Sequence, residues 1–291
     1  MGGAALALRL AGCRGPANVI ERRDAFLQAV AAKPVIMGIL NITPDSFSDG
    51  GKFNSREAAC QQAERMAREG ADIIDIGAES TRPGAIPVAE AEEIARIEAI
   101  LGAVRAAVDL PLSIDTSKAN VARRAMAMGA DVINDVWGLQ RDAAMAATVA
   151  ETGAAVVIMH NRAEKDASLD IIDDMRRFFD HSLALAAAAG VPRHVIILDP
   201  GIGFGKTQMQ NLQAIRGLDQ LASYGLPILA GISRKSLLGA VLGTDVHNRL
   251  IGSISAHLAA AAHGARIFRV HDVAEHVTAL RVFEAVEHGH V

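Results

Sequence analysis

The order of apolar and amphipathic segments is the feature that most limits the fold of this chain. Eight short aliphatic runs recur, separated mostly by amphipathic, alanine-rich stretches; the runs occupy residues 35–40, 72–77, 112–115, 131–134, 155–159, 195–199, 227–231 and 266–270. Residues 56–68 and 90–108, between runs, carry apolar side chains at helical spacing. Strict alternation of strand and helix predicts a parallel sheet with helical crossovers. Eight such units in about 250 residues have the size of a (β/α)8 barrel, an α/β fold.

Glycines support the same alternation. Six of them fall just before a predicted strand, where a glycine commonly ends a helix: Gly70, Gly129, Gly153, Gly190, Gly225 and Gly264. The competing fold, an open doubly wound sheet, normally carries a glycine-rich nucleotide turn after its first strand, and this sequence has none there. No stretch rich in proline, glycine or serine divides the chain. We therefore predict one (β/α)8 TIM barrel domain over residues 34–291. Residues 1–33 precede it as a leader that caps the bottom of the barrel or is partly disordered.

Composition and charge exclude several classes of protein. The chain is 51% hydrophobic but only 3% aromatic, which predicts an aliphatic core. Its formal net charge is −4 and it has no basic run, so we expect no nucleic-acid partner. No window reaches the roughly 20 apolar residues that cross a bilayer, and the lipoprotein-like box at 10–13 lacks the preceding charges of an export signal. The two cysteines, Cys13 and Cys60, are too few for a disulfide framework and lack the spacing of metal ligands. This cysteine usage favours a protein of the reducing cytoplasm.

Polar residues follow the predicted strands at the same end. They are Asn41, Glu79, Asp115, Asn134, Asp135, His160, Asp199, Lys235, Arg269 and His271. In a (β/α)8 barrel, the functional side chains come from the carboxyl ends of the strands. Any single member of the set could be a helix cap or a turn residue. Lys235 and Arg269 cannot cap a helix N-terminus, so capping does not explain the whole set.

These residue types suit a flat heterocycle beside an anion. Carboxylates pair with a guanidine-like edge through two parallel hydrogen bonds, and a lysine suits a carbonyl or ring nitrogen. Arg269 can stack on a ring and also face an anion. Asn41, Arg269 and His271 come from the first and last strands, which are neighbours in a closed barrel. Together they could hold a phosphate or pyrophosphate, with Mg²⁺ if it is present.

The run MGILNITPDSFSDGG at 37–51 joins a buried strand to a polar loop. We expect Asn41 to be its fixed part, at the strand end. The residues from Thr43 to Gly51 are expected to form a lid that orders only when the ligand binds.

Seven motifs give this pattern a family resemblance. They are MGILNITPDSFSDGG at 37–51, IIDIGAESTRPGA at 73–85, SIDTSKANVA at 113–122, INDVWG at 133–138, ILDPGIGFGKT at 197–207, GISRKSLLG at 231–239 and FRVHDV at 268–273. In this order and spacing the chain resembles the dihydropteroate synthases from about residue 35 to residue 285. The chain departs from the family pattern at Ala78, in the segment MHNRAEKD at 159–166 and at Leu237-Leu238. None of these departures replaces a residue to which the resemblance gives a role.

The resemblance implies a (β/α)8 barrel enzyme of folate biosynthesis, a transferase that joins 4-aminobenzoate to 6-hydroxymethyl-7,8-dihydropterin diphosphate. The implied catalytic residues are Asn41, Asp115, Lys235 and Arg269. The implied pterin-binding residues are Asp115, Asn134, Met159, Asp199, Phe204, Gly231, Lys235 and Arg269. The diphosphate would bind Asn41, Arg269 and His271, with Mg²⁺ as cofactor on Asn41. The implied aminobenzoate-binding residues are Phe47, Thr81, Arg82, Pro83, Phe204, Lys235 and Ser236.

The implied chemistry needs no protein nucleophile. The diphosphate is a good leaving group once its charge is neutralised, the dihydropterin stabilises the resulting cation, and the neutral arylamine then attacks in an SN1-like path. Family resemblance also implies a sulfonamide target and a homodimer, for which the alanine-rich helix at 253–262 is a candidate surface.

Other interpretations are weighed against this one. A folate-dependent methyltransferase barrel and a non-catalytic pterin-binding paralogue share the pterin site. The glycine-rich run at 201–207 is not a P-loop, because Pro200 stands where a glycine is required, and Lys206 occupies the third glycine of a dinucleotide fingerprint. Four histidines on helical stretches lack matching carboxylates, so we expect core or surface roles rather than metal binding; they are His247, His257, His263 and His276.

Overall fold

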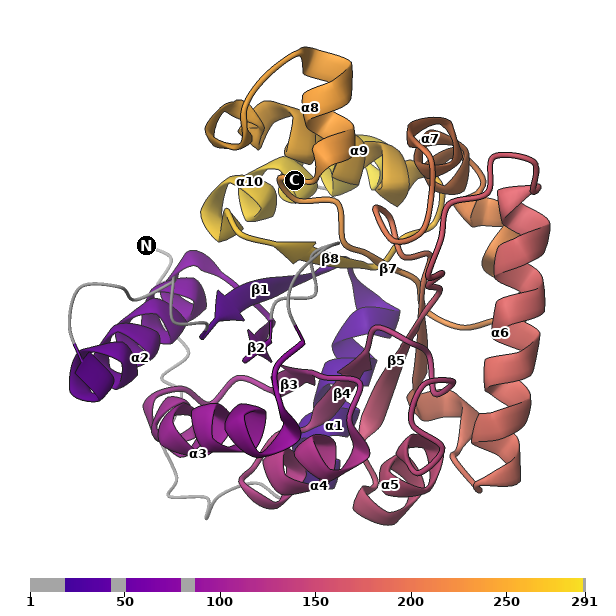
Figure 1. The fold of residues 1–291 in the computed structure, drawn as a ribbon. Helices are drawn as coiled ribbons and strands as arrows, with labels where there is room; N and C mark the ends of the chain where they lie inside the picture. The colour runs from indigo at the N-terminus through magenta and orange to yellow at the C-terminus, as the bar shows by residue number, and fades with distance from the viewer. Residues whose placement is uncertain (1–18, 43–50, 80–86, 290–291) are drawn as a thin grey trace, which may run out of the picture.

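Eight parallel strands form the centre of the molecule. The structure is a computed structural model that describes residues 19–42, 51–79 and 87–289. The strands pair in the order β6-β5-β4-β3-β2-β1-β8-β7. An isolated parallel bridge between Leu198 and Ile228 joins β6 to the start of β7 and so brings the two edges of the sheet together. The predicted (β/α)8 barrel is therefore confirmed, and Figure 1 shows the helices around the outside of the strands.

The strands match the apolar runs closely. Their bounds are β1 Val35–Asn41, β2 Ile73–Gly77, β3 Leu112–Asp115, β4 Val132–Asp135, β5 Ala155–Met159, β6 Ile196–Asp199, β7 Leu229–Ala230 and β8 Ile267–Val270. Seven of the eight are buried along almost their whole length, as expected for parallel strands covered on both faces. The exception to the predicted lengths is β7, of which only two residues of the expected five pair as a strand.

Helices follow the strands in sequence and cover the barrel. Their bounds are α1 Val19–Ala32, α2 Gly51–Glu69, α3 Glu90–Ala107, α4 Ala119–Ala127, α5 Met145–Thr152, α6 Ile171–Ala188, α7 Gln208–Arg216, α8 Ser236–Leu242, α9 Leu250–Ala262 and α10 Val273–His288. Among the described residues, short 3₁₀ helices lie at Arg193–Val195, Leu218–Tyr224 and Val246–Asn248. The six glycines expected to end helices all have positive φ angles, between 63° and 101°. The unit after β7 has an additional helix, because α8 precedes the covering helix α9 (Figure 1).

Helix α1 lies at the amino ends of the strands. Its Arg22 Nε donates to Asp131 Oδ1 at 2.8 Å, directly before β4, and Arg23 donates to the Gly153 carbonyl at 2.5 Å, shortly before β5. Phe26 and Val30 of α1 are buried in the common core. The predicted boundary at residue 33 and the role of the leader stay predictions, because residues 1–18 lie outside the described part. Within the described ranges, no helix combines the length and apolar character needed to cross a membrane.

Candidate active site

Strand register aligns three polar side chains across one end of the barrel. Asn41 pairs with Gly77, Gly77 with Asp115, and Asp115 with Asn134, so the three polar residues lie at one level. A Cβ atom on Gly77 would lie 3.6 Å from Asn41 Oδ1 and 3.7 Å from Asp115 Cβ. A glycine at this position therefore leaves the space between these two side chains open.

Arg269 of β8 reaches past the neighbouring strand β1 and bonds to side chains of β2 and β3. Its Nε donates to Asp75 Oδ2 at 2.6 Å, and its other arm donates to Asp115 Oδ2 at 2.8 Å. Asn134 Nδ2 donates to the same Asp75 oxygen at 3.2 Å. Asp75 was not among the predicted site residues. The signal for it was a charged residue in the middle of the apolar run IIDIG, because a buried charge requires a partner.

Three buried oxygen atoms at this end accept no hydrogen bond from any described residue. They are Oδ1 of Asp75, Oδ1 of Asp115 and Oδ1 of Asn134. Each such acceptor costs about 1–3 kcal/mol unless a donor reaches it. Three of them on adjacent strands indicate a place for a ligand that presents several N–H groups.

Burial shifts the pKa values of the ionisable side chains at this end of the barrel. Removal from water raises the pKa of Asp115 to about 7; the Arg269 guanidinium opposes this rise and the Asp75 carboxylate adds to it. Burial also raises the pKa of Asp199, and it lowers the pKa of Lys235 to about 8. Burial alone would lower the pKa of Arg269, but Asp75 and Asp115 outweigh it and raise that pKa. Arg269 therefore stays protonated beside the carboxyl groups of Asp75 and Asp115. The two carboxyl groups favour a ligand edge rich in hydrogen-bond donors.

Lys235 and its neighbours form the opposite side of the site. The Lys235 ammonium donates to the Ile202 carbonyl and lies 4.7 Å from the centroid of the Phe204 ring. A Cβ atom on Gly231 would lie 3.8 Å from Lys235 Nζ and 3.9 Å from Asp199 Oδ2. Gly231 therefore keeps the space between the cation and the carboxylate open. Met159, which pairs with Asp199 in the sheet, is buried at the end of β5.

A buried lysine holds the loop that carries Phe204. Lys206 is only 1% exposed, and its ammonium group donates to the carbonyls of Gly201 at 2.9 Å and Phe204 at 3.2 Å. It also lies 2.7 Å from Nδ1 of His160, and Nε2 of that ring is 3.1 Å from Asp174. Burial lowers the pKa of Lys206 to about 7 and that of His160 to about 3. The spacing around Lys206 excludes a nucleotide-binding loop, but no pattern in the sequence predicts this structural role of Lys206.

The loops after β7 and β8 contact each other. Ser233 Oγ lies 2.9 Å from His271 Nδ1, and it accepts a hydrogen bond from the His271 backbone N–H at 3.2 Å. Arg234 donates to both carboxylate oxygens of Asp272. His271 is thus held beside the segment that leads to Lys235.

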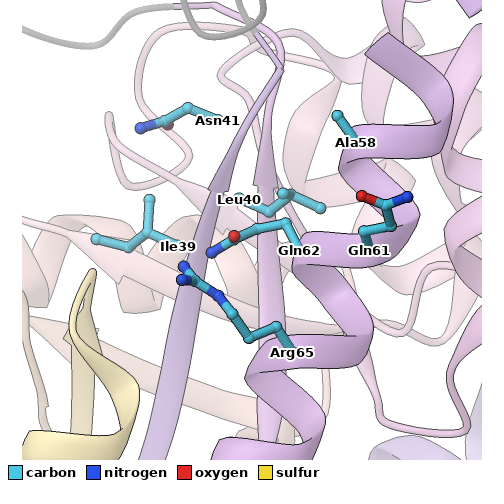
Figure 2. A pocket seen from close by; sticks show the side chains of 7 residues that line it. All are labelled: Ile39, Leu40, Asn41, Ala58, Gln61, Gln62 and Arg65. Atoms are coloured by element: carbon cyan, nitrogen blue, oxygen red, sulfur yellow. The ribbon is translucent and has the colours of Figure 1, made fainter. Parts of the chain in front are cut away.

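Asn41 also borders a pocket between β1 and α2, with a volume of about 450 Å³. Figure 2 shows Gln62 and Arg65 of α2 extending toward β1 in this pocket. The remaining lining residues are Ile39, Leu40, Ala58 and Gln61. Two amides and a guanidinium give one wall of the pocket a polar character.

Glu79 and Val88, on either side of residues 80–86, are bonded to each other and to Lys118. Glu79 accepts from the Val88 backbone N–H at 3.0 Å, and Lys118 donates to Glu79 at 2.6 Å, to Glu93 at 2.5 Å and to the Val88 carbonyl at 2.8 Å. Among the predicted aminobenzoate residues, Ser236 is exposed at the start of α8. Phe47, Thr81, Arg82 and Pro83 lie outside the described residues. So does the predicted lid from Thr43 to Gly51, except for Gly51 itself, which begins α2.

Comparisons with known proteins identify close relatives. The family model of the pterin binding enzymes matches residues 37–271. A dihydropteroate synthase of Clostridium beijerinckii is 44% identical over 261 residues, which are 88% of this chain and 96% of that protein. The crystal structure of a dihydropteroate synthase from Clostridium difficile, determined in the presence of pteroic acid, has a TM-score of 0.85 and 45% identity, and the match covers 87% of this chain and 97% of that one. A Yersinia pestis dihydropteroate synthase in a sulfonamide drug complex has a TM-score of 0.82 and 42% identity, over 88% of this chain and 95% of that one.

Proposed function

The chain belongs to the dihydropteroate synthases of the pterin binding enzyme family, and from this premise we propose which of its residues hold the two substrates. The enzyme joins 4-aminobenzoate to 6-hydroxymethyl-7,8-dihydropterin diphosphate and releases 7,8-dihydropteroate and pyrophosphate. The observation that carries the site assignment is the set of three unsatisfied buried acceptors on Asp75, Asp115 and Asn134 beside Arg269. A pterin presents several N–H donors on one edge of a flat ring, which is the complement of such a set.

The pterin ring lies between two groups of side chains in this proposal. Asp115 and Asn134 accept from its donor-rich edge, while Asp199 and Lys235 meet it from the other side. Arg269 stacks on the ring face, a role that suits a planar guanidinium. The space beside Gly231 accommodates the ring, with Met159 and Phe204 as walls; the geometry around Gly231 supports this placement.

The diphosphate extends toward Asn41, Arg269 and His271. Pairing of β1 with β8 brings the strands of Asn41 and Arg269 together, and this supports a shared anion site. Cations and hydrogen-bond donors at this position lower the cost of the charge that develops on the leaving group.

A magnesium ion fits the donor set. Within the described ranges, no group of three or more His, Cys, Asp or Glu side chains could hold a metal ion. Mg²⁺, however, is usually held by one or two protein oxygens and completes its shell with water and substrate phosphates. The amide oxygen of Asn41 would hold such an ion when it arrives with the diphosphate. Bound there, Mg²⁺ would neutralise part of the leaving-group charge.

The reaction then proceeds by dissociation and capture. The bond between the pterin methylene carbon and the diphosphate oxygen breaks, and its electron pair leaves with the diphosphate. The dihydropterin delocalises the positive charge, and the amine nitrogen of 4-aminobenzoate attacks the methylene and loses a proton. The protein contributes positioning, stabilisation of the anion and exclusion of water.

The aminobenzoate occupies the side of the site nearest to Lys235. Phe204, Lys235 and Ser236 contact it, and Phe47, Thr81, Arg82 and Pro83 enclose it from the two loops. The cation of Lys235 against the Phe204 ring supports a place for a second aromatic ring at this position.

A coupled assay of pyrophosphate release tests the function. Turnover should require both substrates and Mg²⁺, and a sulfonamide should compete with 4-aminobenzoate. Pterin binding without turnover would instead identify a non-catalytic paralogue. Turnover that sulfonamide excess leaves unchanged at low aminobenzoate would contradict the aminobenzoate site.

The enzyme is a cytoplasmic homodimer in this proposal. The two cysteines, Cys13 and Cys60, fit a reducing compartment. Large apolar side chains on α9 and α10 stand exposed: Ile251 at 79%, Val282 at 60% and Val286 at 75%. A second copy of the chain that packs on this face would cover them.

A further inference from the structure

Two histidines outside the substrate site form a continuous buried chain of hydrogen bonds. His257 of α9 and His276 of α10 are each only 1% exposed. Nδ1 of His257 lies 3.0 Å from Nε2 of His276. At one end, the backbone N–H of Ile232 donates to His257 Nε2 at 3.1 Å; at the other, His276 Nδ1 lies 2.6 Å from the Asp272 carbonyl.

The two ends of this chain determine where its protons lie. The Asp272 carbonyl can only accept, so His276 carries its proton on Nδ1 and leaves Nε2 as an acceptor. His257 must then donate from Nδ1, which leaves its Nε2 to accept from the Ile232 N–H. The Ile232 N–H favours the same assignment independently. The Ala230 carbonyl also lies 3.2 Å from His257 Nε2, but a proton on that nitrogen would set two donors against each other at Ile232 and two acceptors against each other between the rings. Burial lowers the pKa of both rings, which keeps them neutral, as the chain requires.

The chain joins the two loops that carry substrate-binding groups. Ile232 directly precedes Ser233-Arg234-Lys235, and Asp272 directly follows His271. Arg234 has a φ of +58°, a backbone conformation that is unfavourable for a residue with a side chain and needs support from its surroundings. Its N–H donates to Ser253 Oγ at 3.0 Å, and its guanidinium pairs with Asp272.

We propose that His257 and His276 are positioning residues: as a neutral hydrogen-bonded pair, they hold the Lys235 loop and the His271 loop in one fixed relation. The loops bear the groups that face the pterin and the diphosphate, so the inference rests on the proposed function. A small shift of either loop misplaces a substrate-binding group, and such shifts reduce the rate by up to about 100-fold.

Kinetics of three variants test the positioning role. His257→Phe keeps a ring against Phe268 but removes both nitrogens, and we expect kcat/KM for the pterin diphosphate to fall at least tenfold in the folded enzyme. His257→Gln, which retains one acceptor and one donor, should recover much of this loss. His276→Asn preserves donation to Asp272 and removes only the acceptor for His257, so it tests the central link if His257→Phe does not fold. His263→Phe, at the residue that directly follows the same helix, is the matched control and should leave kcat/KM unchanged.

The double variant and a spectrum separate positioning from simple stability. If the pair acts as a unit, His257→Phe combined with His276→Asn should lower kcat/KM little more than one substitution alone. Long-range proton–nitrogen spectra of ¹⁵N-histidine enzyme should show both rings protonated on Nδ1 only at pH 7. A ring protonated on Nε2, or folded variants with unchanged kcat/KM, would overturn the proposal. Because the spectrum needs no turnover, it tests the pair even if the proposed synthase activity fails.

Discussion

At the residue scale, Asp75 shares the Arg269 guanidinium with Asp115 and also accepts from Asn134. Substitution Asp75→Asn keeps the shape of the side chain but removes its charge. Hydrogen bonds to charged groups contribute about 1.5–3 kcal/mol, so we expect Kd for the pterin diphosphate to rise roughly tenfold or more. Titration calorimetry measures this, with the exposed Asp219→Asn as control. Unchanged pterin affinity in the Asp75 variant would contradict the role of Asp75 in orienting Arg269.

Asp115 gives a second residue-scale prediction, on stability against pH. Its pKa is raised from 3.8 to about 7 in the folded protein by burial. Between pH 4 and pH 7 the native state binds more protons than the unfolded chain. The contribution of Asp115 to the free energy of unfolding is therefore full below about pH 4 and is lost as the pH rises toward 7. The slope for one proton approaches about 1.4 kcal/mol per pH unit. Urea unfolding of the wild type and Asp115→Asn should be measured from pH 4 to 7. We expect the free energy of unfolding of the wild type to fall relative to that of the variant as the pH rises. Parallel profiles would mean that burial does not shift this group.

At the element scale, strands were predictable and the contacts between loops were not. Apolar runs placed all eight strands, because a buried parallel strand leaves a continuous aliphatic signature. The strand β7 is shorter than its run, since Pro227 lacks a backbone N–H and only Leu229 and Ala230 pair with β8. The barrel fold also led us to expect that the polar residues at the strand ends lie close together. Arg269 does bond to Asp115, and both Arg269 and Asn134 bond to Asp75.

The loop after β6 shows what sequence could not supply. Besides the nearby carbonyls of Gly201 and Phe204, the Lys206 ammonium contacts His160, 46 residues earlier in the chain, and no local sequence pattern encodes that contact. Asp75 bonds to Asn134 and Arg269, 59 and 194 residues later in the chain. His257 bonds to His276, 19 residues later and on another helix. Their roles follow from packing between elements, and so they emerge only from the three-dimensional arrangement.

Lys206→Met tests this loop as an element. The substitution fills a similar volume but removes the donor to the Gly201 and Phe204 carbonyls, so the loop should lose its fixed shape. We expect kcat/KM to fall roughly tenfold, because Phe204 and the Ile202 carbonyl that receives Lys235 both lie on this loop. Steady-state kinetics and protease sensitivity of the loop give the readouts. The exposed Lys165→Met serves as control, and an Lys206 variant with wild-type kinetics would show that the loop holds its shape without the ammonium group.

At the scale of the whole molecule, the barrel separates stability from chemistry by its two ends. Helix α1 contacts the amino ends of the strands, whereas the unsatisfied acceptors of Asp115 and Asn134 lie at the carboxyl ends of theirs, with Asp75 in the middle of β2 beside them. This polarity follows from the parallel strands themselves, since every strand delivers its last side chains to the same end. It explains why the sequence predicted the region of the site better than the individual contacts within it.

The outer surface yields the last prediction, which concerns assembly. Ile251, Val282 and Val286 are exposed on the neighbouring helices α9 and α10, and burying such side chains favours association. A lysine within such a contact also brings an unpaired charge to a surface that loses its water on association, which opposes assembly. We expect Ile251→Lys to convert a dimer into a monomer in light scattering at micromolar concentration, with the barrel still folded. Ile20→Lys, the same exchange at an exposed position on α1, should leave the dimer intact. A wild-type monomer, or a dimer that survives Ile251→Lys, would show that this face is not the interface.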